Sequence, residues 1–451
     1  MKNTVNQSIM PKTAVINENG HLQVGGCDVV DLVEKYGSPL YVYDEETVRS
    51  ACREYKEAFS AYPDTKILYA SKAFLTQAMA CIFAQEGLGL DVVSGGEIYT
   101  AYKAGFPLER AYFNGNNKSS EELELAIDTG VGRVTVDNFF ELALLDSVAK
   151  SKETTVKILL RITPGIDVHT HEYIKTGTLD SKFGFDMTQL DEAIELIKEE
   201  YSNLELVGLH AHIGSQIFEI AQPYNDLIEV VSKQFALIRE KHNIELTEMN
   251  VGGGLGITYT QVDNPPSMFE LAEVILKAFN KCNEEYKLNS PTLIIEPGRS
   301  AICTSGVTLY TVGSAKQVPE GRKYIAVDGG MADNPRPSMY QAKYHAIVAN
   351  KANETATETV TMAGRYCESG DILIRDIELP ETEAGDIICV FNTGAYNYSM
   401  ASNYNRVPRP AAVIVENANS DIIIERESYD NLICLDKVPQ RLSCKKPEGV
   451  L

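Results

Sequence analysis

Between residues 66 and 299, short runs of apolar and β-branched residues alternate with longer amphipathic stretches. The runs are Ile67–Ala70, Leu90–Val93, Ala111–Phe113, Val134–Val136, Val156–Ile162, Leu206–Ile213, Glu248–Val251 and Leu293–Ile295. The stretches between them have helical spacing, as in Glu121–Asp128 and Asp191–Glu200, and Ser119-x-x-Glu122 is typical of a helix start. Regular alternation of strands and helices predicts a parallel sheet with helical crossovers. Eight such units predict an α/β fold with a closed (β/α)₈ barrel of the TIM type, which takes about 250 residues.

An open, doubly wound parallel sheet is the alternative to the barrel. The placement of the unusual residues favours the barrel, because they follow the carboxyl ends of the runs, which share one rim in a closed barrel. These residues are Lys72, Ser94–Glu97, Asn114–Lys118, Asp137-Asn138, Thr163–Gly165, His212, Gly252–Gly254 and Glu296. We therefore expect an active site at this rim.

After about residue 303 the helical patterns largely stop and alternating segments replace them, which predicts an antiparallel β domain. The segments are Val307–Val312, Tyr324–Val327, Tyr344–Val348, Val360–Ala363, Ile387–Phe391, Ala412–Val415 and Ile422–Arg426. Near the start, TAVINENGHLQV predicts a hairpin with Asn19-Gly20 at its turn. We expect this hairpin to join the C-terminal sheet. The predicted domains are therefore a barrel at 39–303 and a discontinuous β domain at 1–38 and 304–451.

The charge balance restricts the partners of the chain. Asp and Glu outnumber Lys and Arg by 63 to 41, which gives a net charge of −22. Because such a surface repels phosphate backbones and anionic lipid, we expect neither nucleic acid nor membrane partners. The start, MKNTVNQSIMPK, has no apolar segment typical of a secretory signal, and no stretch approaches the roughly 18 apolar residues of a spanning helix. We expect a cytoplasmic protein whose nine cysteines, none in a C-x-x-C pair, are reduced thiols.

Lys72 ends the first apolar run, ILYASK, and is flanked by Ser71 and Ala73. A lysine in such a partly apolar rim is expected to have a depressed pKa, which favours a Schiff base with a carbonyl compound. Taken alone, a lysine at this position is more often a surface residue.

His210 and His212 are two residues apart on a predicted strand, so they share a face. This spacing can present two nitrogens to zinc, and His169 and His171 form a second such pair. A zinc hydrolase built on His210 and His212 is therefore one hypothesis. The others are buried structural histidines, or one imidazole that stacks on a planar cofactor.

Two turns end the last two runs. Gly252–Gly254 lets backbone N–H groups approach an anion closely, although a plain tight turn is the simpler interpretation. Glu296 either pairs with Arg299 as a salt bridge or meets a ring nitrogen, which would turn a heterocycle into an electron sink. Together with Lys72 these turns suit a flat, phosphorylated nitrogen heterocycle, since the last two units of such barrels commonly bind phosphate. Cys367–Asp371, taken alone, reads as a polar loop.

The combination of segments resembles the pyridoxal-phosphate decarboxylases with an alanine-racemase-like fold, and within them the enzymes that act on diaminopimelate. The resemblance covers roughly residues 20 to 435, and its specificity lies in the order and spacing of the segments. They are YASKAF, GLDVVSGGE, HEYIKTGTLDSKFGF at 171–185, HAHIGSQ, GGGLG, EPGR, MADNPRPSMY, CESGD and NTGAYNYSMASNYN. Ser71 and Phe74 depart from the family pattern around the lysine, and Asn397 stands where glycine is common.

The resemblance implies roles for the matching residues. Lys72 would hold pyridoxal 5'-phosphate covalently, His212 would stack on its ring, and Glu296 would meet the ring nitrogen. The implied phosphate contacts are Ser215, Gly252, Gly253, Gly254, Gly298, Arg299 and Tyr396. The implied contacts to substrate carboxylates are Arg299, Arg336, Tyr340 and Tyr396.

For the reaction, the resemblance implies decarboxylation of meso-2,6-diaminopimelate to L-lysine in a homodimer. Glu368 would bind the distal ammonium, and Cys367 would come from the partner subunit and supply the proton that replaces carbon dioxide. Sister enzymes that act on carboxynorspermidine, ornithine or arginine are the alternative, and Arg336 together with the Cys367-Glu368 loop argues against them. A relative that has lost activity is a third interpretation, which nothing in the sequence favours.

Overall fold

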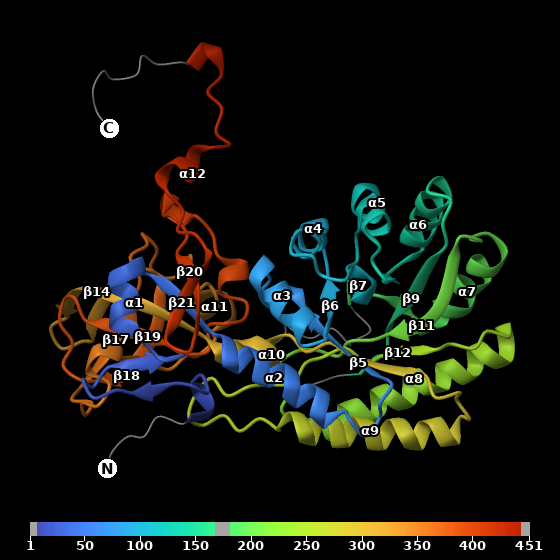
Figure 1. Ribbon diagram of the computed structural model, residues 1–451, viewed down its shortest axis with the longest axis horizontal. Coiled ribbons are helices and arrows are strands. Elements are labelled where there is room, and N and C mark those ends of the chain that lie inside the picture. The colour runs from blue at the N-terminus through green and yellow to red at the C-terminus, as the bar shows by residue number, and fades with distance from the viewer. Residues whose placement is uncertain (1–6, 167–180, 443–451) are drawn as a thin grey trace.

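Figure 1 shows the computed structural model of the chain, which describes residues 7–166 and 181–442. A barrel surrounded by helices lies beside a second unit built around a sheet. His169, His171 and most of the segment 171–185 lie outside the described residues. No helix within the described ranges is long and apolar enough to cross a membrane.

Eight parallel strands form the barrel. They are β5 (Thr65–Ala70), β6 (Gly89–Val92), β7 (Ala111–Phe113), β8 (Arg133–Val136), β9 (Val156–Thr163), β11 (Leu204–His210), β12 (Glu248–Asn250) and β13 (Thr292–Ile295). Each pairs in parallel with the next, and β13 pairs with β5, so the sheet is closed. The eight predicted strands and the barrel are thus confirmed, and the open-sheet alternative is wrong. A short extra strand, β10 (Phe185–Asp186), pairs with β9.

Helices surround the barrel on its outside (Figure 1). They are α2 (Glu45–Ala58), α3 (Gln77–Gln85), α4 (Gly95–Lys103), α5 (Ser120–Thr129), α6 (Phe139–Ser151), α7 (Leu190–Glu199), α8 (Ala221–His242) and α9 (Met268–Glu285). The predicted capping box at Ser119 and Glu122 is present at the start of α5. Side chains of Thr76, Ser94 and Asn138 cap α3, α4 and α6. These caps fix where the strand-to-helix loops end, and so place the loops at the barrel rim.

The second unit contains a mixed sheet with β14 (Gly306–Gln317) near its centre. Its other strands are β4 (Leu40–Asp44), β15 (Lys323–Val327), β16 (Ala346–Val348), β17 (Glu358–Ala363), β18 (Ile372–Leu379), β19 (Ile387–Val390), β20 (Ala411–Glu416) and β21 (Asn419–Ile424). Most pairs are antiparallel as predicted, but β4–β20 and β15–β17 are parallel. An alternating pattern shows which face of a strand is buried, but it does not show the direction of the neighbouring strand. The parallel direction of these two pairs could therefore not be predicted from the sequence.

The predicted hairpin forms between β1 (Val15–Ile16) and β2 (Leu22–Val24), and β3 (Cys27–Asp28) adds a third strand. The prediction that it joins the C-terminal sheet is wrong, because these strands form a sheet of their own. The hairpin instead packs on the second unit, since Leu22 and Val24 share a core cluster with Val307. The domain boundary at residue 39 stays a prediction; the strand that follows it, β4, pairs with β14 and β20.

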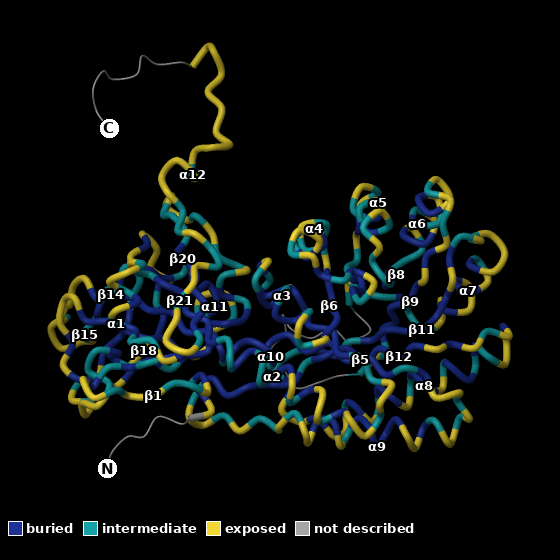
Figure 2. Tube along the Cα trace, in the orientation of Figure 1, coloured by how far each residue is buried: buried dark blue, intermediate teal, exposed yellow. Residues whose placement is uncertain are grey.

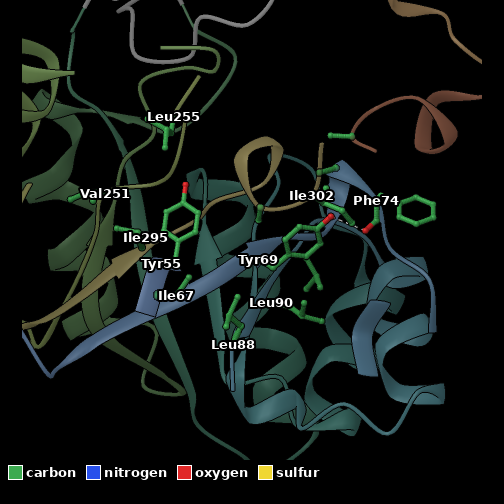
Figure 3. Packing of buried hydrophobic residues seen from close by; sticks show 14 of the residues in the cluster. Tyr55, Ile67, Tyr69, Phe74, Leu88, Leu90, Val251, Leu255, Ile295 and Ile302 are labelled. Atoms are coloured by element: carbon green, nitrogen blue, oxygen red, sulfur yellow. Dashed lines mark hydrogen bonds between the residues drawn. The ribbon is translucent and has the colours of Figure 1, made fainter. Parts of the chain in front are cut away.

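A large core cluster runs from the barrel into the second unit, so the two units pack as one body. In Figure 2 the strands are mostly buried, and exposure concentrates on the outer helices and the C-terminal segment. Part of this core lies beneath the turn after β5 (Figure 3). There the Tyr69 hydroxyl donates to the Phe74 carbonyl at 2.8 Å, and the Tyr69 ring stacks on Phe83. This packing fixes the turn that carries Lys72.

An ion-pair cluster lies at the amino ends of the barrel strands. The Glu248 carboxylate, only 4% exposed, accepts from Arg133 at 2.8 Å, Lys66 at 3.0 Å and Tyr112 at 3.0 Å. These donors come from β5, β7 and β8, so a single carboxylate on β12 joins strands across the barrel.

Replacing Glu248 with alanine is expected to lower the free energy of unfolding by about 2–3 kcal/mol, because the Arg133 guanidinium and the Lys66 ammonium lose the buried carboxylate with which they pair. Half-exposed Lys66 keeps the effect below that of a fully buried pair. Urea unfolding followed by circular dichroism measures it. Glu245→Ala, at an exposed position three residues away, is the matched control. An equal loss in both variants would contradict the role of the cluster.

Candidate active site

A cavity of about 730 Å³ opens at the carboxyl ends of the barrel strands and extends to the second unit. Most of the predicted site residues line it, although they are scattered from residue 72 to residue 396. They are Lys72, His212, Ser215, Gly254, Glu296, Gly298, Arg299, Arg336, Tyr340 and Tyr396. The barrel supplies the first seven, whereas α11 (Arg336–Tyr340) and the loop at Tyr396 belong to the second unit. The predicted rim is therefore completed by the second unit.

Lys72 stands in the single turn Ser71–Ala73 that directly follows β5. Its side chain keeps solvent-accessible surface and is among those that line the cavity. Burial by itself lowers the pKa of Lys72, but Asp91, Tyr396 and Glu296 together outweigh it, so the pKa is raised. The prediction of a depressed pKa was wrong, because the apolar flanks visible in the sequence do not reveal the carboxylates of β6 and β13.

Glu296 is buried at the end of β13 and accepts three hydrogen bonds from other strand ends. Asn250 Nδ2 donates at 2.7 Å and Asn114 Nδ2 at 3.3 Å, and His210 Nε2 lies 3.1 Å away. Burial alone would raise the pKa of Glu296, but the His210 ring and the Asn250 amide lower it below its usual value. The carboxylate therefore stays ionised and has a fixed direction.

This arrangement decides between two hypotheses for Glu296. Within the described residues Glu296 forms no ion pair with Arg299, so the simple salt bridge is not present. His210 is engaged with Glu296, while His212 Nδ1 accepts from the Gly253 N–H at 3.3 Å. The residues that the structure describes contain no group of three or more His, Cys, Asp or Glu side chains arranged as metal ligands.

The glycine turn brings three loops into close contact. A Cβ atom on Gly253 would lie 2.0 Å from the Glu296 carbonyl, and one on Gly252 would lie 2.6 Å from His212 Nδ1. Gly254 has φ +126°, and its Cβ would meet the Gly214 carbonyl at 2.5 Å. Of the three, Gly254 lines the cavity, whereas Gly252 lets the His212 ring, and Gly253 the Glu296 backbone, lie close to the turn. Glycine is required here for close packing as well as for an open anion site.

Arg299 and Arg336 bring two buried positive charges to the same cavity. Arg299 donates to the Tyr259 hydroxyl at 2.6 Å and to Ser215 Oγ at 3.1 Å. The Arg336 guanidinium lies 5.6 Å from the ring centres of Tyr259 and Tyr396. In both residues Nε is buried without a hydrogen-bond partner. Neither guanidinium pairs with a carboxylate among residues 7–166 and 181–442, so the cavity is built to bind anions.

Tyr396 has a left-handed backbone, with φ +62°, which costs a residue with a side chain roughly 1 kcal/mol or more. Its N–H donates to the Ala73 carbonyl at 2.8 Å, which ties the second unit to the turn of Lys72. The Arg299 guanidinium lies 4.8 Å from its ring centre. The strained backbone therefore places the Tyr396 ring between the lysine turn and the arginines.

Cys367 and Glu368 are not among the residues that line this cavity. Cys367 is exposed, and its N–H donates to Asn405 Oδ1 at 2.9 Å. Asp371 holds the loop from inside, because its carboxylate accepts from the Met331 N–H at 2.7 Å and the Tyr366 N–H at 2.8 Å. The loop is thus anchored but presents its thiol to the outside of its own chain.

Several residues of the site were missed as site residues in the sequence. They are Asp91, Arg161 and Asn250, all buried within a barrel strand. Asn114 was expected at the rim, and His210 was considered as a zinc ligand or a structural histidine, but their contacts with Glu296 were not foreseen. Burial and the nearby Glu296 raise the pKa of Asp91, while Lys72 opposes the shift. A usable signal existed for Asp91, Arg161 and Asn250, since each interrupts an otherwise apolar run near its carboxyl end. A polar residue in a buried strand faces the interior of the barrel and needs a partner there.

The donor set fits pyridoxal phosphate. The amine of Lys72 can meet its aldehyde, and the ionised Glu296 carboxylate can meet its ring nitrogen. One of the two guanidiniums, which have no carboxylate partner among the described residues, can meet its phosphate. The remaining guanidinium is then available for a substrate carboxylate. The guanidiniums of Arg299 and Arg336, which line the cavity and pair with no carboxylate among the described residues, are the observation that calls for anionic ligands.

Comparison with known proteins agrees with this chemistry. A family profile described as "Pyridoxal-dependent decarboxylase, pyridoxal binding domain" matches residues 45–303. The diaminopimelate decarboxylase of Synechocystis sp. is 52% identical, over 97% of this chain and 94% of that relative. The diaminopimelate decarboxylase of Bacillus subtilis is 50% identical, over 93% of this chain and 96% of that relative.

A solved structure supports the same grouping. The crystal structure of diaminopimelate decarboxylase from M. jannaschii in complex with L-lysine superposes with a TM-score of 0.89. It is 37% identical and covers 96% of this chain and 99% of that chain. The chain therefore belongs to the pyridoxal-dependent decarboxylases, and within them to the diaminopimelate decarboxylases.

Proposed function

We propose that this protein decarboxylates meso-2,6-diaminopimelate to L-lysine and carbon dioxide, the last step of lysine biosynthesis by this route. The observation that carries the proposal is the pair of buried guanidiniums of Arg299 and Arg336, which face one cavity without a carboxylate partner. One cation can meet the cofactor phosphate, and a second is then left for a substrate carboxylate. The names of the relatives at 50–52% identity and the L-lysine complex of a related structure agree with this substrate.

Pyridoxal phosphate is the cofactor, and when bound it supplies the electron sink that accepts the charge left on Cα as carbon dioxide departs. Lys72 would hold it covalently, and His212 would lie against its ring. Glu296, kept ionised by its hydrogen bonds, would hold a proton on the ring nitrogen. The proposed phosphate contacts are Ser215, Gly252, Gly253, Gly254, Gly298, Arg299 and Tyr396.

The substrate would be held at both ends. Arg299, Arg336, Tyr340 and Tyr396 would bind its carboxylates, and the aromatic rings beside Arg336 would keep that guanidinium in place. Glu368 would bind the distal ammonium. Because Glu368 and Cys367 do not line the cavity of their own chain, we propose that both reach the site of a second subunit in a homodimer.

In that dimer Cys367 would supply the proton that replaces carbon dioxide on Cα, because an exposed thiol on a loop can enter a neighbouring cavity. The thiol gives up its proton as the new C–H bond forms, and it regains one from solvent. The active sites would therefore be shared across the interface. A cytoplasmic location also stays a proposal.

The assay that tests the substrate is carbon dioxide release with added pyridoxal phosphate from diaminopimelate, ornithine, arginine, lysine and carboxynorspermidine. We expect release from diaminopimelate and little from the others, which lack a second amino acid centre. Preference for ornithine or arginine would contradict the proposed substrate but would not affect the assignment of the cofactor. The zinc hydrolase alternative predicts colourless protein with bound zinc, whereas the proposed enzyme is yellow when loaded.

Replacing Arg336 with lysine is expected to raise KM for diaminopimelate by roughly tenfold to a hundredfold, because an ammonium cannot reproduce a planar guanidinium held between rings. Cofactor loading, read from the yellow colour, should stay close to that of the wild type. Steady-state kinetics measure the change. Arg365→Lys, at an exposed arginine, is the matched control. A KM unchanged in Arg336→Lys would remove this residue from the substrate site.

A further inference from the structure

The last described residues, 429–442, form a C-terminal arm that leaves the body of the molecule. In Figure 1 α12 (Tyr429–Ile433) and the chain after it rise away from both sheets, and Figure 2 shows them exposed. Large apolar side chains are exposed along the arm: Tyr429 by 79%, Ile433 by 55%, Leu435 by 88% and Val438 by 70%. A helix of five residues is not stable alone in water, and such a concentration of exposed apolar side chains marks an interaction surface.

The arm is bonded to the loop that precedes it in the second unit. Arg406 Nη1 donates to the Leu432 carbonyl at 3.1 Å, and the same guanidinium pairs with Asp436. Asn405, the neighbour of Arg406, accepts from the Cys367 N–H at 2.9 Å. Asn405 and Arg406 both have left-handed backbones, with φ +53° and +59°. A short chain of direct contacts therefore runs from the arm to the loop of Cys367.

We propose that the C-terminal arm docks on a second copy of this chain and thereby fixes the Cys367 loop against that copy. We infer a second copy as the partner because the arm and the Cys367 loop are both hydrogen-bonded to the segment Asn405–Arg406. If the Cys367 loop enters the active site of a second subunit, the C-terminal arm, which is bonded to the same segment, lies at the same interface. The inference thus rests on the proposed function for the identity of the partner.

Two copies that each carry a net charge of −22 repel one another, so their association needs apolar contact. The arm supplies such contact through Ile433, Leu435 and Val438, and its Lys437 and Arg441 offset Asp430 and Asp436, so it adds no net charge to the repulsion. An apolar arm without net charge fits a second copy of this chain better than a nucleic acid, which would require a positively charged surface.

Sedimentation velocity of the cofactor-loaded protein over a concentration series tests the docking. The variant is Leu435→Asp with Val438→Asp, and we expect its dissociation constant for self-association to rise tenfold or more, since central apolar contacts dominate such interfaces. Carbon dioxide release should fall at low protein concentration and recover at high concentration. Val15→Asp, an exposed apolar residue of β1, is the control and should behave as the wild type. Wild-type association in the double variant, or an equal loss in the control, would overturn the proposal.

A photocrosslink gives a second reading that does not depend on a destabilising variant. With a benzophenone amino acid at Leu435, irradiation should yield covalent dimers joined between the arm and another chain. Crosslinks confined to single chains would overturn the docking, and so would a wild-type protein that is monomeric at every concentration. Both measurements stand even if no tested amino acid is decarboxylated, so a failure of the proposed function is distinguishable from a failure of the arm.

Discussion

Replacing Lys72 with alanine is expected to abolish decarboxylation, with a loss of at least roughly 10³-fold in kcat, because Lys72 is the amine that we propose bonds to the cofactor. Borohydride should bleach the yellow wild type and leave the reduced cofactor on the peptide that contains Lys72. In Lys72→Ala the cofactor should wash out during dialysis and no peptide should be labelled. Carbon dioxide release, absorbance and peptide mass spectrometry measure the three effects.

Lys343 offers a matched control, because it is a second lysine that lines the same cavity. Lys343→Ala should keep the labelled Lys72 peptide after reduction. The two lysines differ in their surroundings, since Asp91 and Glu296 act on the pKa of Lys72, whereas Lys343 lies in the segment after α11 of the second unit. A label on Lys343, or full activity in Lys72→Ala, would contradict the assignment on which the site depends.

The raised pKa of Lys72 has a consequence for this chemistry. The free amine is more often protonated at neutral pH than an ordinary lysine, so it must give up a proton before it can bond to an aldehyde carbon. Asp91 is buried beside it with a pKa raised by burial and by Glu296, and is thus a group that can take part in this proton transfer. Because Glu296 acts on both Asp91 and Lys72, the titration of any one of the three groups depends on the other two.

The barrel was predictable because its signal is local and repeated. Each strand is a short apolar run, and α3, α4, α5, α6 and α9 each start at a capping side chain. Eight such units are the number that closes the barrel. The rim followed from the same pattern, since parallel strands point their carboxyl ends the same way. Thus Lys72, His212 and Glu296, although far apart in sequence, were correctly expected at one cavity.

The features of the fold and of the site that could not be predicted from the sequence depend on contacts between distant segments. The partners of Glu296 are side chains on β7, β11 and β12, and their convergence depends on the barrel stagger. The separate sheet of the N-terminal hairpin depends on which strands lie next to β14, and here that place is taken by β4. The resemblance to a family supplied the roles of Cys367 and Glu368, because a loop that faces away from its own cavity has no local signal for catalysis.

Replacing Glu296 with glutamine is expected to lower kcat by roughly 10²- to 10³-fold while the yellow colour is retained, because the variant keeps the shape of the side chain and removes its charge. His210, Asn114 and Asn250 all direct hydrogens at this carboxylate. An amide accepts at one end only, so one of these donors would lose its partner. The ring nitrogen would then no longer be held protonated by an ionised group, and charge on Cα would be stabilised less.

The matched control is Glu97→Gln, because Glu97 is a partly buried carboxylate in the first turn of α4 and accepts from the Val93 N–H at 2.7 Å. Burial raises the pKa of Glu97 to about 7, whereas the pKa of Glu296 is lowered. Neutralising Glu97 therefore changes little near neutral pH, and its kcat should fall less than tenfold. Removing the Glu296 charge should also lower the pKa of Asp91, which the carbon-13 shift of its carboxyl group reports across a pH series. An unchanged kcat in Glu296→Gln, with an unchanged Asp91 titration, would mean that this carboxylate holds the strand ends together and has no part in the chemistry.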